Sequence, residues 1–505
     1  MEITSSEPDP IEYFINESLL TGCNYDALLG NSSFYYIRRT DFYKRRFRIF
    51  EAVLEKKYFT QFFILISQLI KVFAANLRLI VRRVSFIGHG LEINLSHNEA
   101  SQLDYIFVSH SFGKEEEADT YFGKIPHLVA RGKNVLVAKI DHSASWLPGF
   151  GGVGITQVDD HLTQLVIPSV IPIRHLLKCY FTTLLSLKKL SIWPDHWASQ
   201  LFGRLSLFGS DAIFDHCFRF HFEKLIDKAR ANAVVVITYE GYGWERRVCD
   251  LVHTRKIKAK VIGYHHCHYR SDQVSVNHKM CSTAAPDMIF VTNQKAQREF
   301  TSSYAVPVHN VGSFRAPGLI KDIKLTTKNG TSPSAVLLIP EGIGTEEKIF
   351  LRFISKFAKK LPETKFIYRP HPSRTHLNPI FRIYFRLLNL RNVSISENSL
   401  ASDVTSAKFV VFRGSMAVYE CLNYNAGLIF LSSNDGLSSI LEKLDYQKIS
   451  INDRVDMIKS ILSSPRYTPE KRNPDFRHSV MKDICEPMNE SYFTELLRDV
   501  RSSQE

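Results

Sequence analysis

Five short segments of the sequence place polar or charged side chains just after an apolar run. They are Glu240-Gly241, His265-His266, Glu341-Gly342, Arg369-Pro370-His371-Pro372 and Arg413-Gly414-Ser415. Each apolar run has the composition of a buried strand, and in open α/β sheets ligands bind outside the carboxyl ends of the strands. These residues are therefore the first candidates for a functional site.

The segment Arg369-Pro370-His371-Pro372 has a backbone that its prolines restrict. Pro370 disfavours the helical region for Arg369, and Pro372 does the same for His371, so both side chains are preset in an extended turn. A histidine held beside a guanidinium suits a phosphate or a departing phosphate oxygen. The alternative is a strand-ending turn whose histidine bonds a backbone carbonyl, and an isolated His-Pro pair would favour that alternative.

The segment RGSMAVYE at 413–420 strengthens the functional interpretation. Gly414 allows close backbone approach, and Ser415 is expected at a helix N-terminus, where free N–H groups and the helix dipole favour an anion. Glu420 is placed to reach a ribose hydroxyl; the alternative is a solvent-facing carboxylate. With Arg369 and His371, these residues predict a cradle for a nucleotide monophosphate or diphosphate. Glu341 and Gly342 are expected to line the same site.

Cofactor and metal sites are not expected. The segment PEGIGTEEK lacks the GxGxxG spacing of a dinucleotide site. His265, His266 and His268 beside Cys267 suggest a metal at first sight, but on a strand they alternate between faces, and no second ligand pair with fitting spacing follows. We therefore predict no metal, and expect a histidine from this group to contact a bound substrate instead.

Net charge and cysteine content limit the class of partner. The chain of 505 residues carries a formal charge of +13, which implies anionic partners: nucleic acid, an anionic membrane or a phosphorylated substrate. No zinc finger, helix-turn-helix or RNA-binding signature is present, and the basic residues are spread along the chain, so nucleic acid is not expected. Eight cysteines without a CxxC pair, and no secretory signal, predict a cytoplasmic location.

Two apolar segments, 58–82 and 171–193, bear on membrane contact. In the first, Lys71 and Arg78 would each cost roughly 2.5–3.5 kcal/mol inside a bilayer, so a spanning helix is not expected. The second mixes Leu, Phe and Trp with basic residues, as interfacial helices do. Two interpretations of these segments stay open. They are helices that dock on the membrane surface, or they are core helices whose basic faces are solvated.

Short apolar strands alternate with helices from about residue 100 onward. The sequence predicts strands at 104–110, 134–141, 162–168, 233–240, 260–266 and 287–292, then at 335–339, 365–368, 393–396, 408–412 and 428–432. Among the helices, one capped by Thr345 should bury Ile349, Phe353, Phe357 and Leu361, another should begin at Ser402 and Asp403, and a third at Ser415. The fold class is α/β with two Rossmann-like domains.

The expected domain order follows from these patterns. Residues 1–100 form a helical, aromatic and basic preface; 101–318 form the first Rossmann-like domain, on the acceptor side; 319–334, rich in turn formers, form the linker. Residues 335–483 form the second, nucleotide-binding domain. Residues 484–505 hold a closing helix that can pack on either domain.

The order of these motifs resembles the GT-B glycosyltransferases of bacterial surface polysaccharide synthesis, and most closely the sialyl-, polysialyl- and Kdo-type transferases that use CMP-activated sugars. The resemblance covers about residues 100–435 and rests on an acid-Gly motif, a His-Pro motif and a Gly-Ser helix start followed by Glu. The stretches at 117–142, YEGYGWE and YHHCHYR also resemble a group of surface-carbohydrate biosynthesis proteins. The resemblance to GT-B glycosyltransferases implies two Rossmann-like domains that face a cleft, and no requirement for metal.

The resemblance also implies roles for individual residues. Glu240 matches the acid of the family's acid-acid-Gly motif, with Tyr239 in place of the first acid, and would be the general base. Glu245 is the alternative carboxylate, and the choice between inverting and retaining chemistry stays open. His371 and Ser415 would bind the phosphate of the leaving CMP.

The donor implied by the resemblance is a CMP-activated acidic sugar, Kdo or a nonulosonic acid, whose carboxylate Arg369 or Arg413 would bind. The acceptor is a glycan or lipid-linked glycan, and the enzyme would lie on the inner face of an anionic membrane. One alternative is an enzyme of the same fold that uses a UDP-sugar or CDP-glycerol. Another is a non-catalytic, membrane-associated assembly protein.

Overall fold

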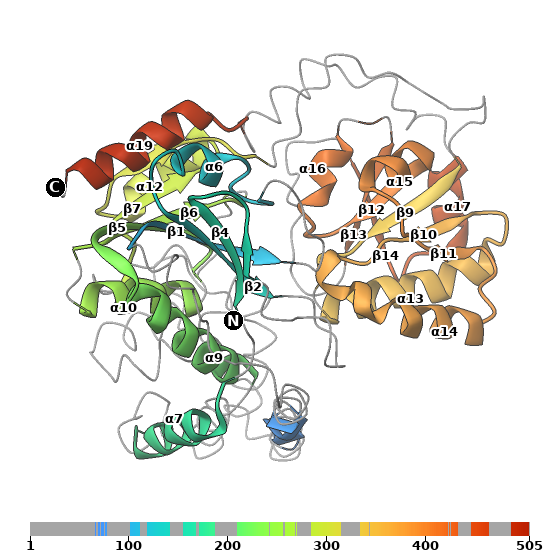
Figure 1. The fold of residues 1–505 in the computed structure, drawn as a ribbon. Helices are drawn as coiled ribbons and strands as arrows, with labels where there is room; N and C mark the ends of the chain where they lie inside the picture. Colours follow the sequence, from blue (N-terminus) through green and yellow to red (C-terminus); the bar gives the residue numbers. More distant parts are fainter. Residues whose placement is uncertain are drawn as a thin grey trace, which may run out of the picture. The chain divides into compact units, whose positions relative to one another are not determined.

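The structure is a computed structural model of the chain, and its fold divides into two compact units (Figure 1). Unit 1 comprises residues 1–311 and 489–505, and unit 2 comprises 312–488. The structure describes residues 66, 69–70, 72–74, 76–77, 102–111, 119–141, 155–167, 171–186, 210–241, 243–255, 258–267, 269, 284–314, 334–342, 344–422, 424, 426–432, 446–463 and 486–503. Most of the predicted preface (1–100) and of the predicted linker (319–334) lies outside these residues.

Unit 1 is built on a sheet of eight strands in the order β3-β4-β2-β1-β5-β6-β7-β8. All neighbouring strands pair in parallel except β3, which is antiparallel to β4. The strands are β1 (Leu103–Ser111), β2 (Val135–Asp141), β3 (Ile155–Gln157), β4 (Leu162–Ile167), β5 (Ala229–Thr238), β6 (Lys260–His265), β7 (Met288–Val291) and β8 (Val308–Asn310). The chain order reverses between β1 and β5, which makes their carboxyl ends the expected ligand edge.

The described helices of unit 1 include α6 (Ile125–Val129), α7 (Ile173–Ser186), α9 (Ser210–Ile226), α10 (Gly243–Thr254), α12 (Gln294–Ser303) and α19 (Glu490–Ser502). The predicted closing helix is α19, and it packs on unit 1 (Figure 1). Its Phe493 ring meets Phe290 and Tyr264 edge to face, at 4.9 and 5.8 Å between centroids. Arg501 Nη2 donates to Asp104 Oδ1 at 2.6 Å, a buried ion pair that ties the helix to β1.

Unit 2 has a sheet of six parallel strands in the order β11-β10-β9-β12-β13-β14. They are β9 (Ala335–Ile339), β10 (Phe366–Tyr368), β11 (Val393–Ile395), β12 (Ala407–Phe412), β13 (Gly427–Ser432) and β14 (Gln447–Ser450). Counted from β9, this is the order 3-2-1-4-5-6 of a Rossmann sheet, with the reversal between β9 and β12. The predicted α/β class is confirmed, with one mostly parallel sheet in unit 1 and one parallel sheet in unit 2.

Helices cover both faces of the unit 2 sheet. They are α13 (Gly344–Lys360), α14 (Asn378–Leu387), α15 (Leu400–Ser406), α16 (Ala417–Cys421) and α17 (Val455–Ser463), with a 3₁₀ helix at Pro372–Leu377. The predicted apolar stripe of α13 is confirmed, because Ile349, Phe353, Phe357 and Leu361 belong to the core that this helix shares with α14 and α17. A second core lies under α15 and α16.

Three predicted helix starts are wrong. α13 begins at Gly344, so Thr345 lies inside the helix. α15 is capped by Ser399, whose hydroxyl accepts the N–H of Ser402 at 3.2 Å. α16 has five residues and begins after Met416, so Ser415 lies two positions before the helix. For α15, a nearby serine with the same capping chemistry sets the start, whereas Met416 before α16 makes no side-chain cap.

Candidate functional site

In unit 2, the predicted residues after β9, β10 and β12 lie at neighbouring strand ends, since these three strands are adjacent. Gly342 has φ +88°, and a Cβ built on it would lie 2.6 Å from Cγ of His371. Only glycine fits a backbone that combines this conformation with such close approach to an imidazole. The Glu341-Gly342 loop and the His371 turn therefore pack directly on each other, as the sequence predicts for one site.

Glu346, in the first turn of α13, joins two of these loops. Its Oε2 accepts the N–H of Glu341 at 2.7 Å, and its Oε1 accepts the N–H of Gly414 at 3.4 Å. The same Oε1 lies 3.7 Å from Nε of Arg413, and both side chains are buried. The carboxylate thus fixes the loops after β9 and β12 relative to each other. Glu346 is not among the residues that the sequence predicts for this site.

Arg374, three residues after His371 in the 3₁₀ helix, contacts the same loop. Its Nε donates to the carbonyl of Gly342 at 3.1 Å and lies 3.5 Å from Oε2 of Glu347. Burial raises the pKa of the Glu347 carboxyl, and the Arg374 charge opposes that change. Arg374 is therefore a cation beside His371 that sequence reasoning missed.

The two arginines expected to bind a donor carboxylate have partners inside unit 2. Arg413 is buried, and its Nη1 donates to the carbonyl of Leu431 at 2.6 Å. Arg369 Nη1 donates to Asp403 Oδ2 at 2.7 Å and to the carbonyl of Asn398 at 2.6 Å. Both guanidinium groups thus support the strand ends through internal contacts.

Ser415 and Glu420 lie in the loop after β12 and in α16. Ser415 is buried, and its carbonyl accepts the N–H of Val418 at 3.2 Å. Glu420 is half-buried. Burial is the main cause that raises the pKa of the Cys421 thiol; Glu420 raises it further and Arg369 lowers it.

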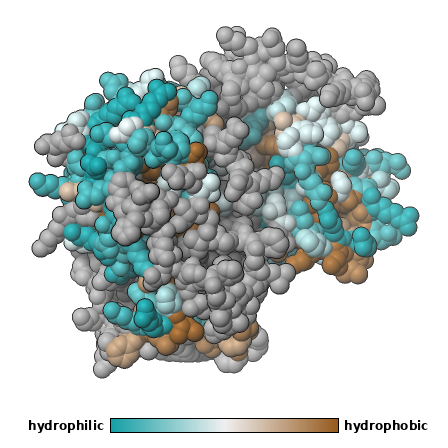
Figure 2. Space-filling view, in the orientation of Figure 1, coloured by the Kyte–Doolittle hydropathy of each residue, from teal (hydrophilic) through white to brown (hydrophobic). Residues whose placement is uncertain are grey.

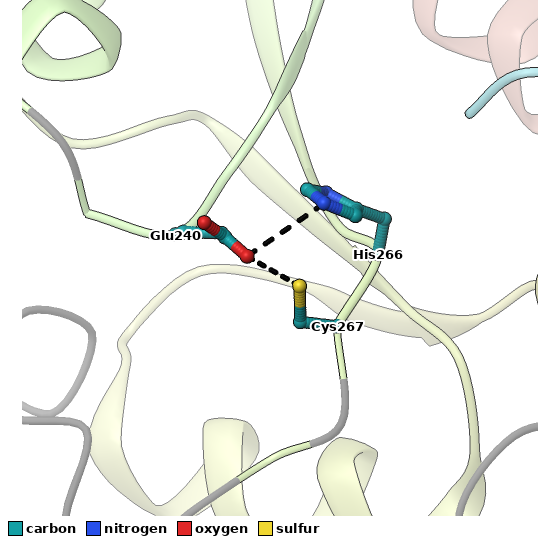
Figure 3. A group of neighbouring side chains, drawn as sticks. All are labelled: Glu240, His266 and Cys267. Atoms are coloured by element: carbon teal, nitrogen blue, oxygen red, sulfur yellow. Dashed lines mark hydrogen bonds and ion pairs between the residues drawn. The ribbon is translucent and has the colours of Figure 1, made fainter. Parts of the chain in front are cut away.

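In unit 1, Glu240 follows β5 and meets residues that follow the neighbouring strand β6 (Figure 3). Its carboxylate accepts a hydrogen bond from the Cys267 thiol, and Oε1 lies 3.6 Å from Nε2 of His266. The side chains of Glu240 and His266 are only 3% and 7% exposed. The Tyr121 ring packs edge-on against His266, with centroids 4.4 Å apart. The structure thus brings together a carboxylate, an imidazole and a thiol.

Glu245 does not share this arrangement. It is fully buried in the first turn of α10, and its Oε2 accepts the N–H of Glu240 at 2.8 Å. His265 is also buried, with its ring 4.8 Å from Phe300 on the core side. Trp244 packs against Phe218, at 5.4 Å between ring centroids, and is a core residue. Of the predicted unit 1 residues, Glu240 and His266 come together.

The two candidate groups share a motif that sequence reasoning missed. Residues 240–245 read EGYGWE and residues 341–346 read EGIGTE, the same Glu-Gly-x-Gly-x-Glu spacing. In each case the first glycine has positive φ, +78° and +88°, the second glycine begins a helix, and the last carboxylate accepts the N–H of the first glutamate. A guanidinium donates to the carbonyl of the first glycine in both, from Arg246 and from Arg374.

Comparison with known proteins gives similarity to solved structures only. No protein-family model and no curated protein matches the chain. The chain is similar to a trehalose 6-phosphate synthase from Burkholderia multivorans, with 11% identity over 80% of this chain and 98% of that one and a TM-score of 0.46. It is similar to a UDP-GlcNAc 2-epimerase from Methanocaldococcus jannaschii (12% identity, 78% and 99% coverage, TM-score 0.42). It is also similar to UGT71G1 from Medicago truncatula (11%, 80% and 99%, TM-score 0.39). Values this low carry no argument about activity.

Proposed function

We propose that the protein is a glycosyltransferase that moves a sugar from a nucleotide-activated donor to a glycan acceptor. The observation that carries the proposal is the strand-end group of unit 2, where Gly342 packs on His371 and Glu346 ties their neighbour Gly414 to the same edge. This group lies at the reversal point of a 3-2-1-4-5-6 sheet, the place where such sheets bind nucleotides.

The proposed donor is a CMP-activated acidic sugar, Kdo or a nonulosonic acid. His371 stabilises the phosphate of the leaving CMP, with Arg374 as the neighbouring cation and Ser415 as a further phosphate contact. Glu240 accepts the proton of the acceptor hydroxyl while the new oxygen–carbon bond forms and the bond from the anomeric carbon to the phosphate oxygen breaks. The Glu245 carboxylate accepts the backbone N–H of Glu240 and so supports that residue; in this proposal it does not touch substrate.

Calorimetric titration of the full chain with CMP, CDP, UDP and GDP tests the nucleotide part of the proposal. We expect CMP to bind most tightly, and His371→Ala to weaken binding by about 10- to 100-fold, since a hydrogen bond to a charged group contributes roughly 1.5–3 kcal/mol. His161→Ala, an exposed histidine of unit 1, is the control and should bind as the wild type does.

The other outcomes have definite meanings. Preference for UDP or CDP would replace the CMP donor with a UDP-sugar or CDP-glycerol and keep the site. Absence of binding to any of the four nucleotides would overturn the glycosyltransferase proposal and favour a non-catalytic assembly protein.

Peripheral contact with an anionic membrane, and hence a position on the inner face of the membrane, is part of the proposal. In the described part of the chain, no helix is long and apolar enough to cross a bilayer. On α7, however, Ile173, Leu177 and Phe181 are each more than half exposed and recur every four residues, so they share one face. Figure 2 shows the apolar surface over this helix.

A second set of exposed apolar residues lies beside that face. Ile66, Leu69, Ile70, Phe73 and Leu77 are exposed on a helical stretch of the same unit. The Tyr180 hydroxyl donates to the side-chain oxygen of Asn76, which joins this stretch to α7. With Arg174 and Lys178 exposed next to the apolar face, the surface has the chemistry of an interfacial helix on anionic lipid.

A further inference from the structure

We propose that Glu240, His266 and Cys267 bind a divalent transition-metal ion, with zinc the best match to their chemistry. The three side chains offer an oxygen, a nitrogen and a sulfur whose atoms all lie within 4.8 Å of one another (Figure 3). A tetrahedral zinc ion with bonds of about 2.0–2.3 Å holds its ligand atoms roughly 3.3–3.8 Å apart. The separation of 3.6 Å between His266 Nε2 and Glu240 Oε1 falls in that range.

The donor set selects the type of ion. Calcium and magnesium prefer oxygen ligands, whereas thiolate and imidazole favour zinc and related ions. Charge balance favours the same choice, because one carboxylate and one thiolate neutralise a divalent cation at a site where Glu240 and His266 are almost fully buried. On binding, the Cys267 thiol gives up its proton to solvent, and a sulfur–metal bond replaces its hydrogen bond to Glu240.

The site is held in place by its surroundings. Glu245 fixes the backbone of Glu240 through the 2.8 Å hydrogen bond to its N–H, and the Tyr121 ring packs against His266. Three protein ligands leave one position of a tetrahedral ion for water or another small ligand. The site is therefore preformed on two adjacent strand ends, which reduces the ordering that metal binding requires.

The prediction of no metal treated residues 265–268, Cys267 included, as a strand whose side chains alternate between faces, and sought further ligands by their spacing in the sequence. His265 and His266 do face opposite sides, as strand alternation predicts, and His265 lies in the core. Cys267, however, follows the end of β6, and the third ligand comes from the neighbouring strand β5. Ligands that meet only through strand pairing have no characteristic spacing in the sequence.

Cobalt substitution is the direct test, because a thiolate bound to Co²⁺ gives a charge-transfer band in the near ultraviolet. The full chain, without a histidine tag, is reduced, stripped with a chelator and titrated with Co²⁺. We expect a band that saturates at one ion per chain, release of about one proton per ion, and displacement of the band by zinc.

Variants locate the ion. Cys267→Ser should remove the band, and His266→Gln should weaken Co²⁺ affinity at least about tenfold. Cys179→Ser, a cysteine of similar exposure on α7, should keep the band. Thermal melting of each variant without metal checks that it is folded. Absence of a thiolate band in the wild type, or its persistence in Cys267→Ser, would overturn the site.

This test does not depend on sugar transfer. The proposed function uses Glu240 as the base, so a bound ion would occupy that carboxylate, and zinc should inhibit transfer in the wild type and not in Cys267→Ser. Nucleotide binding is measured at His371 in unit 2, so failure of the metal site and failure of the glycosyltransferase proposal give different results.

Discussion

In each unit, one buried glutamate holds the backbone of a neighbouring loop. Glu245 and Glu346 each accept the N–H of a glutamate five residues earlier. Sequence reasoning found the residues that end the strands because strand ends are recognisable. It missed Glu346 and named Glu245 only as an alternative catalytic carboxylate, because the support of a backbone N–H depends on how a loop folds back onto the first turn of a helix. The repeated Glu-Gly-x-Gly-x-Glu spacing was the available signal.

Gly342 is the residue whose replacement tests the geometry of the unit 2 site. Gly342→Ala should destabilise the fold by about 1–3 kcal/mol, because its φ of +88° disfavours a Cβ and the added atom would collide with the His371 ring. Moving that ring should also weaken nucleotide binding. Chemical denaturation and calorimetric titration measure the two effects.

Gly132→Ala is the matched control. Gly132 has φ +74°, but a Cβ there would meet nothing within 4 Å, so the variant carries only the conformational cost. Equal destabilisation of the two variants, with nucleotide binding retained in both, would show that packing of Gly342 on His371 does not shape the site.

At the scale of elements, buried parallel strands were predictable, whereas three of the four edge strands were not. The predicted strands at 335–339, 408–412 and 428–432 match β9, β12 and β13 to within one residue, because a strand covered on both faces is a continuous apolar run. The short strands β3, β8 and β14 were missed, since three or four residues with polar members give no clear period.

The link between α13 and the strand ends gives a prediction at this scale. Glu346→Ala would leave the N–H groups of Glu341 and Gly414 without their acceptor and Arg413 without its buried carboxylate. We expect a loss of about 3–5 kcal/mol in unfolding free energy, as for other broken buried pairs. Glu346→Gln keeps an acceptor oxygen and should lose less.

Glu347→Gln is the control for that measurement. Because burial raises the pKa of Glu347, its ionised form costs stability at pH 7, above its ordinary pKa, and the neutral amide removes that cost. Glu347→Gln should therefore be neutral or stabilising at pH 7. If Glu347→Gln lost as much unfolding free energy as Glu346→Ala, the hydrogen bonds of Glu346 to the two loops would not explain the effect of its removal.

At the scale of the whole molecule, the chain leaves unit 1 after Val311 and returns at Asn489. Asn489 N–H donates to the carbonyl of Val311 at 2.9 Å, so the two passages lie side by side. Gly312 has φ +76°, and a Cβ there would lie 2.1 Å from the carbonyl oxygen of Pro487. The sequence predicted the closing helix from its apolar spacing, but its return to unit 1 depends on these non-local contacts.

Membrane contact is the remaining prediction at this scale, because it depends on a surface rather than on a site. Leu177→Glu with Phe181→Glu should lower binding to vesicles that contain anionic lipid by at least about 100-fold, since burying each apolar side chain contributes roughly 1.5–3 kcal/mol. Vesicle sedimentation at low and high salt measures this loss, and wild-type binding should weaken with salt.

The control uses an equally exposed apolar face in the other unit. Ile383 and Leu387 of α14 are 55% and 80% exposed, so Ile383→Glu with Leu387→Glu changes the same chemistry by the same amount. Because the proposed membrane surface belongs to unit 1, this variant should bind vesicles as the wild type does. Equal loss in both variants would mean that exposed apolar side chains bind lipid without preference, and the docking role of α7 would be wrong.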